Sequence, residues 1–120
     1  MLKKITDGTV VAERVMCAAT FSRRLRGLMF TKTFPVGMDA LILTPCNAVH
    51  TMFMRYSLDI LFLDGENKVL HILEDMGPGR FSPVVKGASS VVEMIAGSVA
   101  KCGVVVGDRL SWNEKGKAVC

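Results

Sequence analysis

Several features that identify common classes of protein are missing from this sequence. It contains no run of about 20 apolar residues that could span a bilayer. The residues after the initial Met-Leu-Lys-Lys are interrupted by polar side chains, unlike the apolar region of a signal peptide. Its glycines follow neither the G-x-x-x-x-G-K nor the G-x-G-x-x-G pattern of phosphate-binding loops. We therefore expect a cytoplasmic protein with no membrane partner and no phosphate loop of these two kinds.

Aromatic residues and paired cysteines are also scarce. With one Trp and one Tyr, the chain offers few rings on which single-stranded nucleic acid could stack. Its net charge of +4 is only mildly basic, so we expect no nucleic-acid partner. The four cysteines form no C-x-x-C pair and no Cys/His set at zinc spacing. We therefore expect free thiols, no metal centre and no cofactor.

Length and composition fit one folded domain. A chain of 120 residues, half of them apolar and 22% charged, is long enough to bury a core of its own. No linker, repeat or low-complexity segment divides it. We expect a single domain over residues 1–120, with a loose tail at 113–120, that is a monomer or a weak dimer.

Short apolar segments separated by turn residues predict mostly strands. Residues 58–63 and 69–73 flank the turn sequence Asp-Gly-Glu-Asn and predict a hairpin. Further strands are expected at 41–43, 90–95, 104–106 and 109–112, with one or two more in 9–18. Two short helices are expected, at 22–30 and between Ser98, as the cap, and Gly103. The fold class predicted is β-rich α+β, with short mixed and antiparallel strands forming a barrel-like sheet.

The most informative segment is HTMFMRYSLDILFLD, from His50 to Asp64, which places charged residues in an otherwise apolar run. Charged groups are costly to bury unless they are paired or used in a site. Arg55 and Asp59 could form a structural ion pair, which we favour because paired buried charges commonly just satisfy each other. Alternatively, Arg55 could hold an anionic ligand as a bidentate fork.

Two residues later in the chain are candidate partners for this segment. Arg80 lies on a loop rich in Gly and Pro, where it could act as a second arm that binds an anion. Glu93 alternates with Val91 and Ile95 along a predicted strand and so shares their face. If that face is buried, Glu93 needs a cationic or hydrogen-bonding partner, which Arg55 or Arg80 could supply.

Six motifs along the chain together resemble those of the domain of unknown function 192 family. They are RLRGLMF, GM at 37–38, HTMFMRYSLDILFLD, PGR at 78–80, VVEMIAG and CGVVVGD. The resemblance extends from about residue 18 to residue 108, with the motifs in order and at sensible spacing. It implies a compact β-rich fold but no established activity, so the function has to be inferred from the residues.

The leading hypothesis is a small binding or accessory module without catalytic residues. Its polar pocket would accept an anionic small molecule or a peptide carboxylate, because charged residues converge within apolar strands. The candidate ligand-binding residues are His50, Arg55, Asp59, Arg80 and Glu93.

Two other functions remain as alternatives. A hydrolase could use Asp59 and Glu93 as its acid and base, with burial raising one of the two pKa values. A soft-metal binder could use His50, Met52 and Met54, which have period two and would face one way on a strand. We favour neither, because structural networks also perturb pKa values and methionines also fill gaps in apolar cores.

Overall fold

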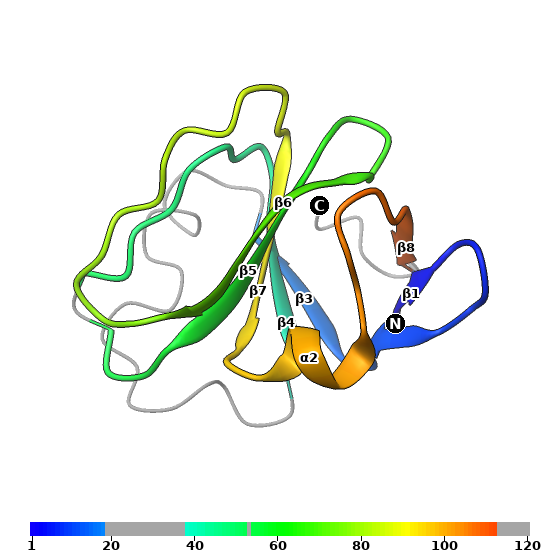
Figure 1. The fold of residues 1–120 in the computed structure, drawn as a ribbon, viewed down its shortest axis with the longest axis horizontal. Helices are drawn as coiled ribbons and strands as arrows, with labels where there is room; N and C mark the ends of the chain where they lie inside the picture. Colours follow the sequence, from blue (N-terminus) through cyan, green and yellow to red (C-terminus); the bar gives the residue numbers. More distant parts are fainter. Residues whose placement is uncertain (19–37, 53, 113–120) are drawn as a thin grey trace.

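The described strands form two sheets, which Figure 1 shows packed against each other. The computed structural model describes residues 1–18, 38–52 and 54–112. One helix lies in these ranges, α2 (Ser98–Cys102). The strands are β1 (Leu2–Lys4), β2 (Val10–Ala12), β3 (Val15–Ala18), β4 (Ala40–Leu43), β5 (Leu58–Leu63), β6 (Val69–Met76), β7 (Ser90–Ile95) and β8 (Leu110–Trp112).

Five strands form the larger sheet, in the order β3-β4-β7-β5-β6. β3 and β4 are parallel, and all other neighbours are antiparallel. Every residue of β5 is buried, because both faces of this sheet are covered. Burial on both faces explains why β5 is almost continuously apolar and does not alternate with polar residues.

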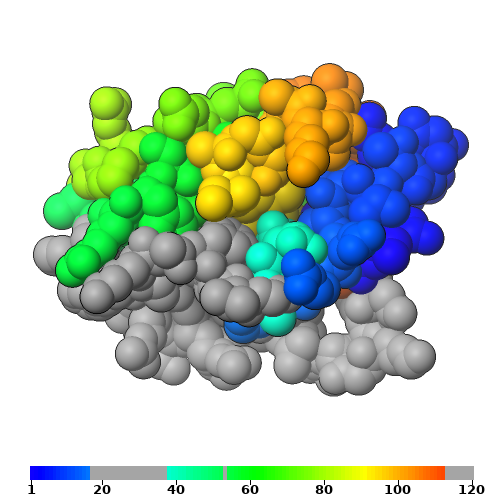
Figure 2. Space-filling view, turned by 90° about the horizontal axis from the view of Figure 1, so that it is seen from below, coloured from blue at the N-terminus to red at the C-terminus, as the bar shows by residue number. Residues whose placement is uncertain are grey.

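The smaller sheet, in the order β2-β1-β8, packs on one face of the larger sheet. Leu2 of β1 and Leu110 of β8 share a core cluster with Leu61 and Val92 of the larger sheet. Helix α2 adds Val99 to the same cluster. In Figure 2, α2 (orange) lies between the end of β7 (yellow) and the N-terminal strands (blue). The smaller sheet and α2 together cover this face of the larger sheet.

The opposite face of the larger sheet carries a second core cluster. Its sheet members include Leu41, Ile60, Phe62 and Val91. Two long connections pack on them, residues 44–57 and residues 77–89, which we call the loop pair; residue 53 lies outside the described ranges. The two connections run side by side on the left of Figure 1. Their contributions to this cluster are Cys46, Val49, Met54, Tyr56, Val85 and Ala88.

The expected β-rich compact fold is confirmed, and so is the predicted hairpin of β5 and β6. The strand predicted at 104–106 is wrong, because Val105 and Val106 lie in an exposed turn. The side chain of Asp108 accepts a hydrogen bond from the N–H of Val105 (2.9 Å), and the N–H of Asp108 donates to the Val105 carbonyl (3.1 Å). These contacts close the valine run into a turn.

Two finer expectations are not confirmed. The described strands belong to two separate sheets instead of one barrel-like sheet. Of the two helices expected, only α2 lies in the described residues; the helix predicted at 22–30 and the tail at 113–120 lie outside them. No helix in the described ranges combines the length and apolar character that spanning a bilayer requires.

Candidate functional site

Asp59 is a buried anchor for backbone N–H groups. Its side chain is 1% exposed, and its Oδ2 accepts hydrogen bonds from the N–H groups of Gly97 (3.0 Å) and Val99 (2.9 Å). Its Oδ1 accepts a third, from the N–H of Asp75 in β6 (2.8 Å). Gly97 is the N-cap residue of α2 and has no side chain that could accept these bonds. Asp59 therefore caps this helix from β5.

Ser98 does not have the capping role that the sequence suggested. Its hydroxyl donates a hydrogen bond back to the carbonyl of Ile95 (2.7 Å). Gly103, in contrast, ends the helix as expected. Its φ of 74° lies in the left-handed region, and its N–H donates to the Val99 carbonyl.

Glu93 is buried in the middle of the larger sheet. It pairs in register with Leu41 of β4 and with Ile60 of β5, so it faces the second core cluster. The residue is 2% exposed, and its Oε1 has no hydrogen-bond partner among the residues that the structure describes. Burial raises the pKa of Glu93 to about 7, because the apolar surroundings cannot solvate the ionised carboxylate.

Asp59 and Glu93 lie on opposite faces of the sheet. Glu93 is paired with Ile60, whereas Asp59 is paired with Met94. Since neighbouring residues of a strand point to opposite sides, the two carboxyl groups are separated by the sheet. They cannot act as acid and base on one substrate, and the hydrolase alternative finds no support in this arrangement.

The predicted ion pair between Arg55 and Asp59 is not formed. Arg55 is exposed in the turn before β5, while both oxygens of Asp59 are bound by backbone N–H groups. Neither Arg55 nor Arg80 forms an ion pair within the described residues. The ion pairs found there are Lys4–Asp108, Arg14–Asp39 and Arg109–Glu66.

Thr51 ties the two halves of the loop pair together. Its side chain is fully buried; its hydroxyl donates to the Gly77 carbonyl (2.6 Å) and accepts from the N–H of Arg80 (2.8 Å). Its own N–H donates to the Arg80 carbonyl, and its carbonyl accepts from the N–H of Gly79, both at 2.8 Å. These four bonds fix the backbone that carries Arg80 against the segment that leads to Arg55.

The loop pair presents basic groups and no acidic ones. Residues 44–57 and 77–89 contain Arg55, Arg80 and Lys86, and neither segment contains an Asp or a Glu. All three basic residues are exposed. The loop pair therefore carries exposed charges of one sign on a backbone that hydrogen bonds hold in place.

His50 belongs to the first connection of the loop pair. It forms an antiparallel bridge with Phe81, and the two rings are tilted against each other with centroids 5.9 Å apart. Its Nδ1 accepts a hydrogen bond from the N–H of Met52 (3.3 Å). Met54 is instead buried in the second core cluster, so the three proposed soft-metal ligands do not form one open set. The described residues also hold no group of three or more His, Cys, Asp or Glu side chains that could bind a metal.

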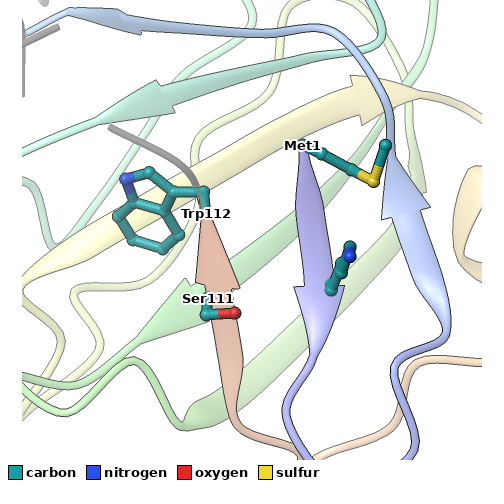
Figure 3. Close-up of a pocket in the computed structure, with 4 residues that line it drawn as sticks. Met1, Ser111 and Trp112 are labelled. Atoms are coloured by element: carbon teal, nitrogen blue, oxygen red, sulfur yellow. The ribbon is translucent and has the colours of Figure 1, made fainter. Parts of the chain in front are cut away.

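A hollow of about 390 Å³ lies elsewhere, on the smaller sheet. It is lined by Met1, Lys3, Ser111 and Trp112, none of which the sequence singled out. Within the described part of the chain, the buried Nε1 of Trp112 has no hydrogen-bond partner. In Figure 3 the side chains of Met1 and Trp112 point away from each other on either side of their strands. The lining supplies a single cationic side chain, Lys3, so this hollow makes a weaker site for an anion than the loop pair.

The five predicted site residues therefore separate into two groups. His50, Arg55 and Arg80 belong to the loop pair, whereas Asp59 and Glu93 are buried on opposite faces of the sheet. Sequence reasoning missed Thr51, although it directly follows His50 in the motif that carried the resemblance. A Thr hydroxyl can both donate and accept a hydrogen bond, but the groups that it bonds here belong to a segment about 26 to 29 residues later, so no local pattern marks it.

Replacing Thr51 with valine is expected to lower the free energy of unfolding by about 1–3 kcal/mol, because the part-buried N–H of Arg80 and carbonyl of Gly77 lose their partner. Hydrogen exchange at the N–H of Arg80 should accelerate as well, because that group donates to the Thr51 hydroxyl. Thr51→Ser keeps the hydroxyl and is the control. If valine and serine have equal effects on exchange at Arg80, the hydroxyl is not the brace.

Comparison with known proteins gives a consistent family but no activity. The family model DUF192, described as uncharacterised, matches residues 2–112. A UPF0127 protein of Pyrococcus furiosus is 38% identical over 111 residues, which cover 91% of this chain and 95% of the relative. A UPF0127 protein of Thermococcus sibiricus is 34% identical, covering 93% of this chain and 74% of the relative.

A solved structure has the same fold. The crystal structure of a protein of unknown function from Novosphingobium aromaticivorans superimposes with a TM-score of 0.72. It is 23% identical, and the match covers 82% of this chain and 74% of that one. The similarity supports the fold described above and adds nothing about ligands.

Proposed function

Since this chain belongs to the domain of unknown function 192 family, which has no established activity, we propose from its geometry that it is a small binding module for anionic ligands. The observation that carries the proposal is the pair of exposed guanidinium groups, Arg55 and Arg80, on a loop pair without acidic residues. A carboxylate or phosphate is the natural partner of a guanidinium, because both can form two parallel hydrogen bonds with it. His50 lies beside Arg80 through its bridge to Phe81.

The hydrogen bonds of Thr51 favour a binding role for these arginines over a role as ordinary solvent-exposed charges. An exposed arginine normally loses side-chain and backbone freedom when it binds an anion, which cancels much of the Coulomb attraction. Here four hydrogen bonds around Thr51 already hold the backbone next to Arg80. Part of the ordering cost is thus met before the ligand arrives.

Asp59 and Glu93 take no direct part in this proposed site. Asp59 caps α2, and the buried carboxyl of Glu93 has no exposed surface for a ligand to contact. A cytoplasmic location, a monomer or weak dimer, and the absence of nucleic-acid and membrane partners stay predictions of the sequence.

Removing either arginine of the loop pair is expected to weaken anion binding. The probe is an acetylated tripeptide with a free C-terminal carboxylate, titrated by isothermal calorimetry at low ionic strength. Arg55→Ala and Arg80→Ala should each reduce the affinity about threefold to tenfold, in line with the loss of one charge-assisted contact. Added salt should weaken the wild-type binding as well, since exposed charges are screened.

Two controls make this measurement specific. The same tripeptide with a C-terminal amide lacks the charge and should not bind at the same site. Arg14→Ala removes another exposed arginine, one that is paired with Asp39, and should leave the affinity unchanged. Equal binding by wild type, Arg55→Ala and Arg80→Ala would contradict the proposal.

A further inference from the structure

The backbone of Phe81 is open on its outer side. The bridge between His50 and Phe81 is made by the N–H of Thr51, which donates to the Arg80 carbonyl (2.8 Å), and by the N–H of Ser82, which donates to the Val49 carbonyl (2.9 Å). In such a pair the N–H and C=O of Phe81 itself point away from the His50 segment. Neither group forms a hydrogen bond within the described residues. A free main-chain donor and acceptor thus lie side by side at the edge of the loop pair.

Large apolar side chains are exposed at the same edge. Phe81 is 72% exposed and Val84 is 70% exposed, the two highest values among the large apolar side chains of the described residues. Arg80 and Lys86 flank them in the sequence. Exposed apolar groups rimmed by polar ones are typical of interaction sites.

We propose that residues 80–86 form a docking edge for an extended peptide segment of a protein partner, one that carries acidic and large apolar side chains. The proposal rests on the proposed anion-binding function and specifies its ligand. The partner's backbone would lie beside Phe81 as an added strand, with its N–H donating to the Phe81 carbonyl and its carbonyl accepting from the Phe81 N–H. Its acidic side chains would contact Arg55, Arg80 or Lys86.

Charge complementarity selects this occupant. The loop pair holds three exposed basic residues and no acidic residue, so a basic or neutral segment would leave its charges unpaired. A small anion would satisfy an arginine but would leave Phe81, Val84 and the open main-chain groups without partners. An extended acidic and apolar segment satisfies all of these groups together.

Pro83 limits the length of the added strand. It has no backbone N–H, so it cannot extend the row of donors beyond Phe81 on the outer side. Main-chain pairing is confined to the two groups of Phe81, and the rest of the affinity has to come from the side chains of residues 80–86. The edge is thereby protected from pairing indiscriminately with other strands.

The experiment begins with an array of randomised hexapeptides that is incubated with the full chain. We expect the bound peptides to be enriched in acidic residues alternating with large apolar residues. The tightest peptide is then synthesised with a fluorescent label, and its affinity is measured by polarisation. An array with no binding above that of the Phe81→Ala variant, or selected peptides without acidic residues, would overturn the proposal.

Backbone pairing is tested with N-methylated versions of the selected peptide. Methylation of the N–H that faces Phe81 should weaken binding at least tenfold, whereas methylation of the next N–H, which faces outward, should have little effect. Phe81→Ala should also weaken peptide binding at least tenfold. Val105→Ala, at another exposed valine remote from the loop pair, is the control and should bind normally. Equal affinity for both methylated peptides would show that no strand is added.

The result separates this proposal from the one on which it rests. If the acetylated tripeptide carboxylate binds in an arginine-dependent manner but no hexapeptide binds, anion binding stands and the docking edge is wrong. If a selected peptide binds with the expected methylation pattern and is unaffected by Arg55→Ala and Arg80→Ala, the edge stands and the anion-binding function is wrong.

Discussion

Replacing Glu93 with glutamine is expected to stabilise the fold more at pH 8 than at pH 4.5. The gain in the free energy of unfolding should be larger at pH 8 by about 3 kcal/mol. Burial raises the pKa of Glu93 from its ordinary value of 4.5 to about 7. Each pKa unit of difference between the folded and unfolded states corresponds to about 1.4 kcal/mol. Glutamine has nearly the same shape as glutamate and cannot ionise, so it removes the whole pH-dependent contribution.

The direction of this effect follows from proton binding in the two states. Below about pH 4.5 both states hold the proton, and Glu93 contributes no pH dependence. Between about 4.5 and 7 the folded state keeps a proton that the unfolded state has released, so wild-type stability falls as pH rises. Above about pH 7 both states are ionised, and the free energy of unfolding of the wild type stays at its lowered value.

Urea unfolding of wild type and Glu93→Gln at four or five pH values between 4.5 and 8 checks this prediction. The difference between the two proteins should widen with pH and then level off. Glu74→Gln changes an exposed glutamate on β6 and should give a curve parallel to that of the wild type. A Glu93→Gln curve that is also parallel would mean that Glu93 is solvated or paired in solution.

Replacing Asp59 with alanine is expected to destabilise the fold by about 3–5 kcal/mol. The change leaves three N–H groups, those of Asp75, Gly97 and Val99, without their acceptor. The bond from Val99 is buried and the other two are part-buried. A buried donor that loses its partner costs about 1–3 kcal/mol, and a part-buried donor costs less because water can replace the acceptor, so the three together amount to about 3–5 kcal/mol. Asp59→Asn should fall between alanine and wild type, because its single oxygen can still accept from the start of α2 but its amide nitrogen cannot accept from Asp75.

Asp64 offers a matched control for Asp59. Its Oδ1 also accepts from two backbone N–H groups, those of Glu66 (2.8 Å) and Lys68 (2.9 Å), and these bonds lower the pKa of Asp64. Its turn is exposed to water, however, so water can replace the carboxylate in Asp64→Ala. Chemical denaturation should show a much larger loss for Asp59→Ala. Equal losses would mean that α2 does not depend on its cap from β5.

The sequence predicted those parts of the fold that local patterns determine. The Asp-Gly-Glu-Asn turn identified the hairpin, and β7 has the predicted bounds, 90–95. β1 was missed because it has only three residues, too few for an alternation pattern, and it lies between its neighbour β2 and the distant β8. Residues 104–106 have the composition of a strand, but the side chain of Asp108 closes them into a turn.

The site was harder to predict than the fold, for two physical reasons. Alternation along β7 placed Glu93 correctly on the face of Val91, yet nothing local indicated that this carboxyl would have an oxygen without a partner among the described residues. Asp59 was expected to meet a guanidinium, but its actual partners are backbone N–H groups about 16 and 40 residues away along the chain. Every residue type except proline has a backbone N–H, so such partners leave almost no mark in the sequence.

The most direct test of the anion-binding site is a nuclear magnetic resonance titration of isotopically labelled protein with the acetylated tripeptide carboxylate. We expect shift changes concentrated at His50, Thr51, Arg55 and residues 79–81, including the guanidinium Nε–H signals of both arginines, and little change with the amide-capped tripeptide. Shift changes centred instead on the hollow at Lys3 and Trp112, or spread evenly over all exposed lysines and arginines, would contradict the anion-binding proposal.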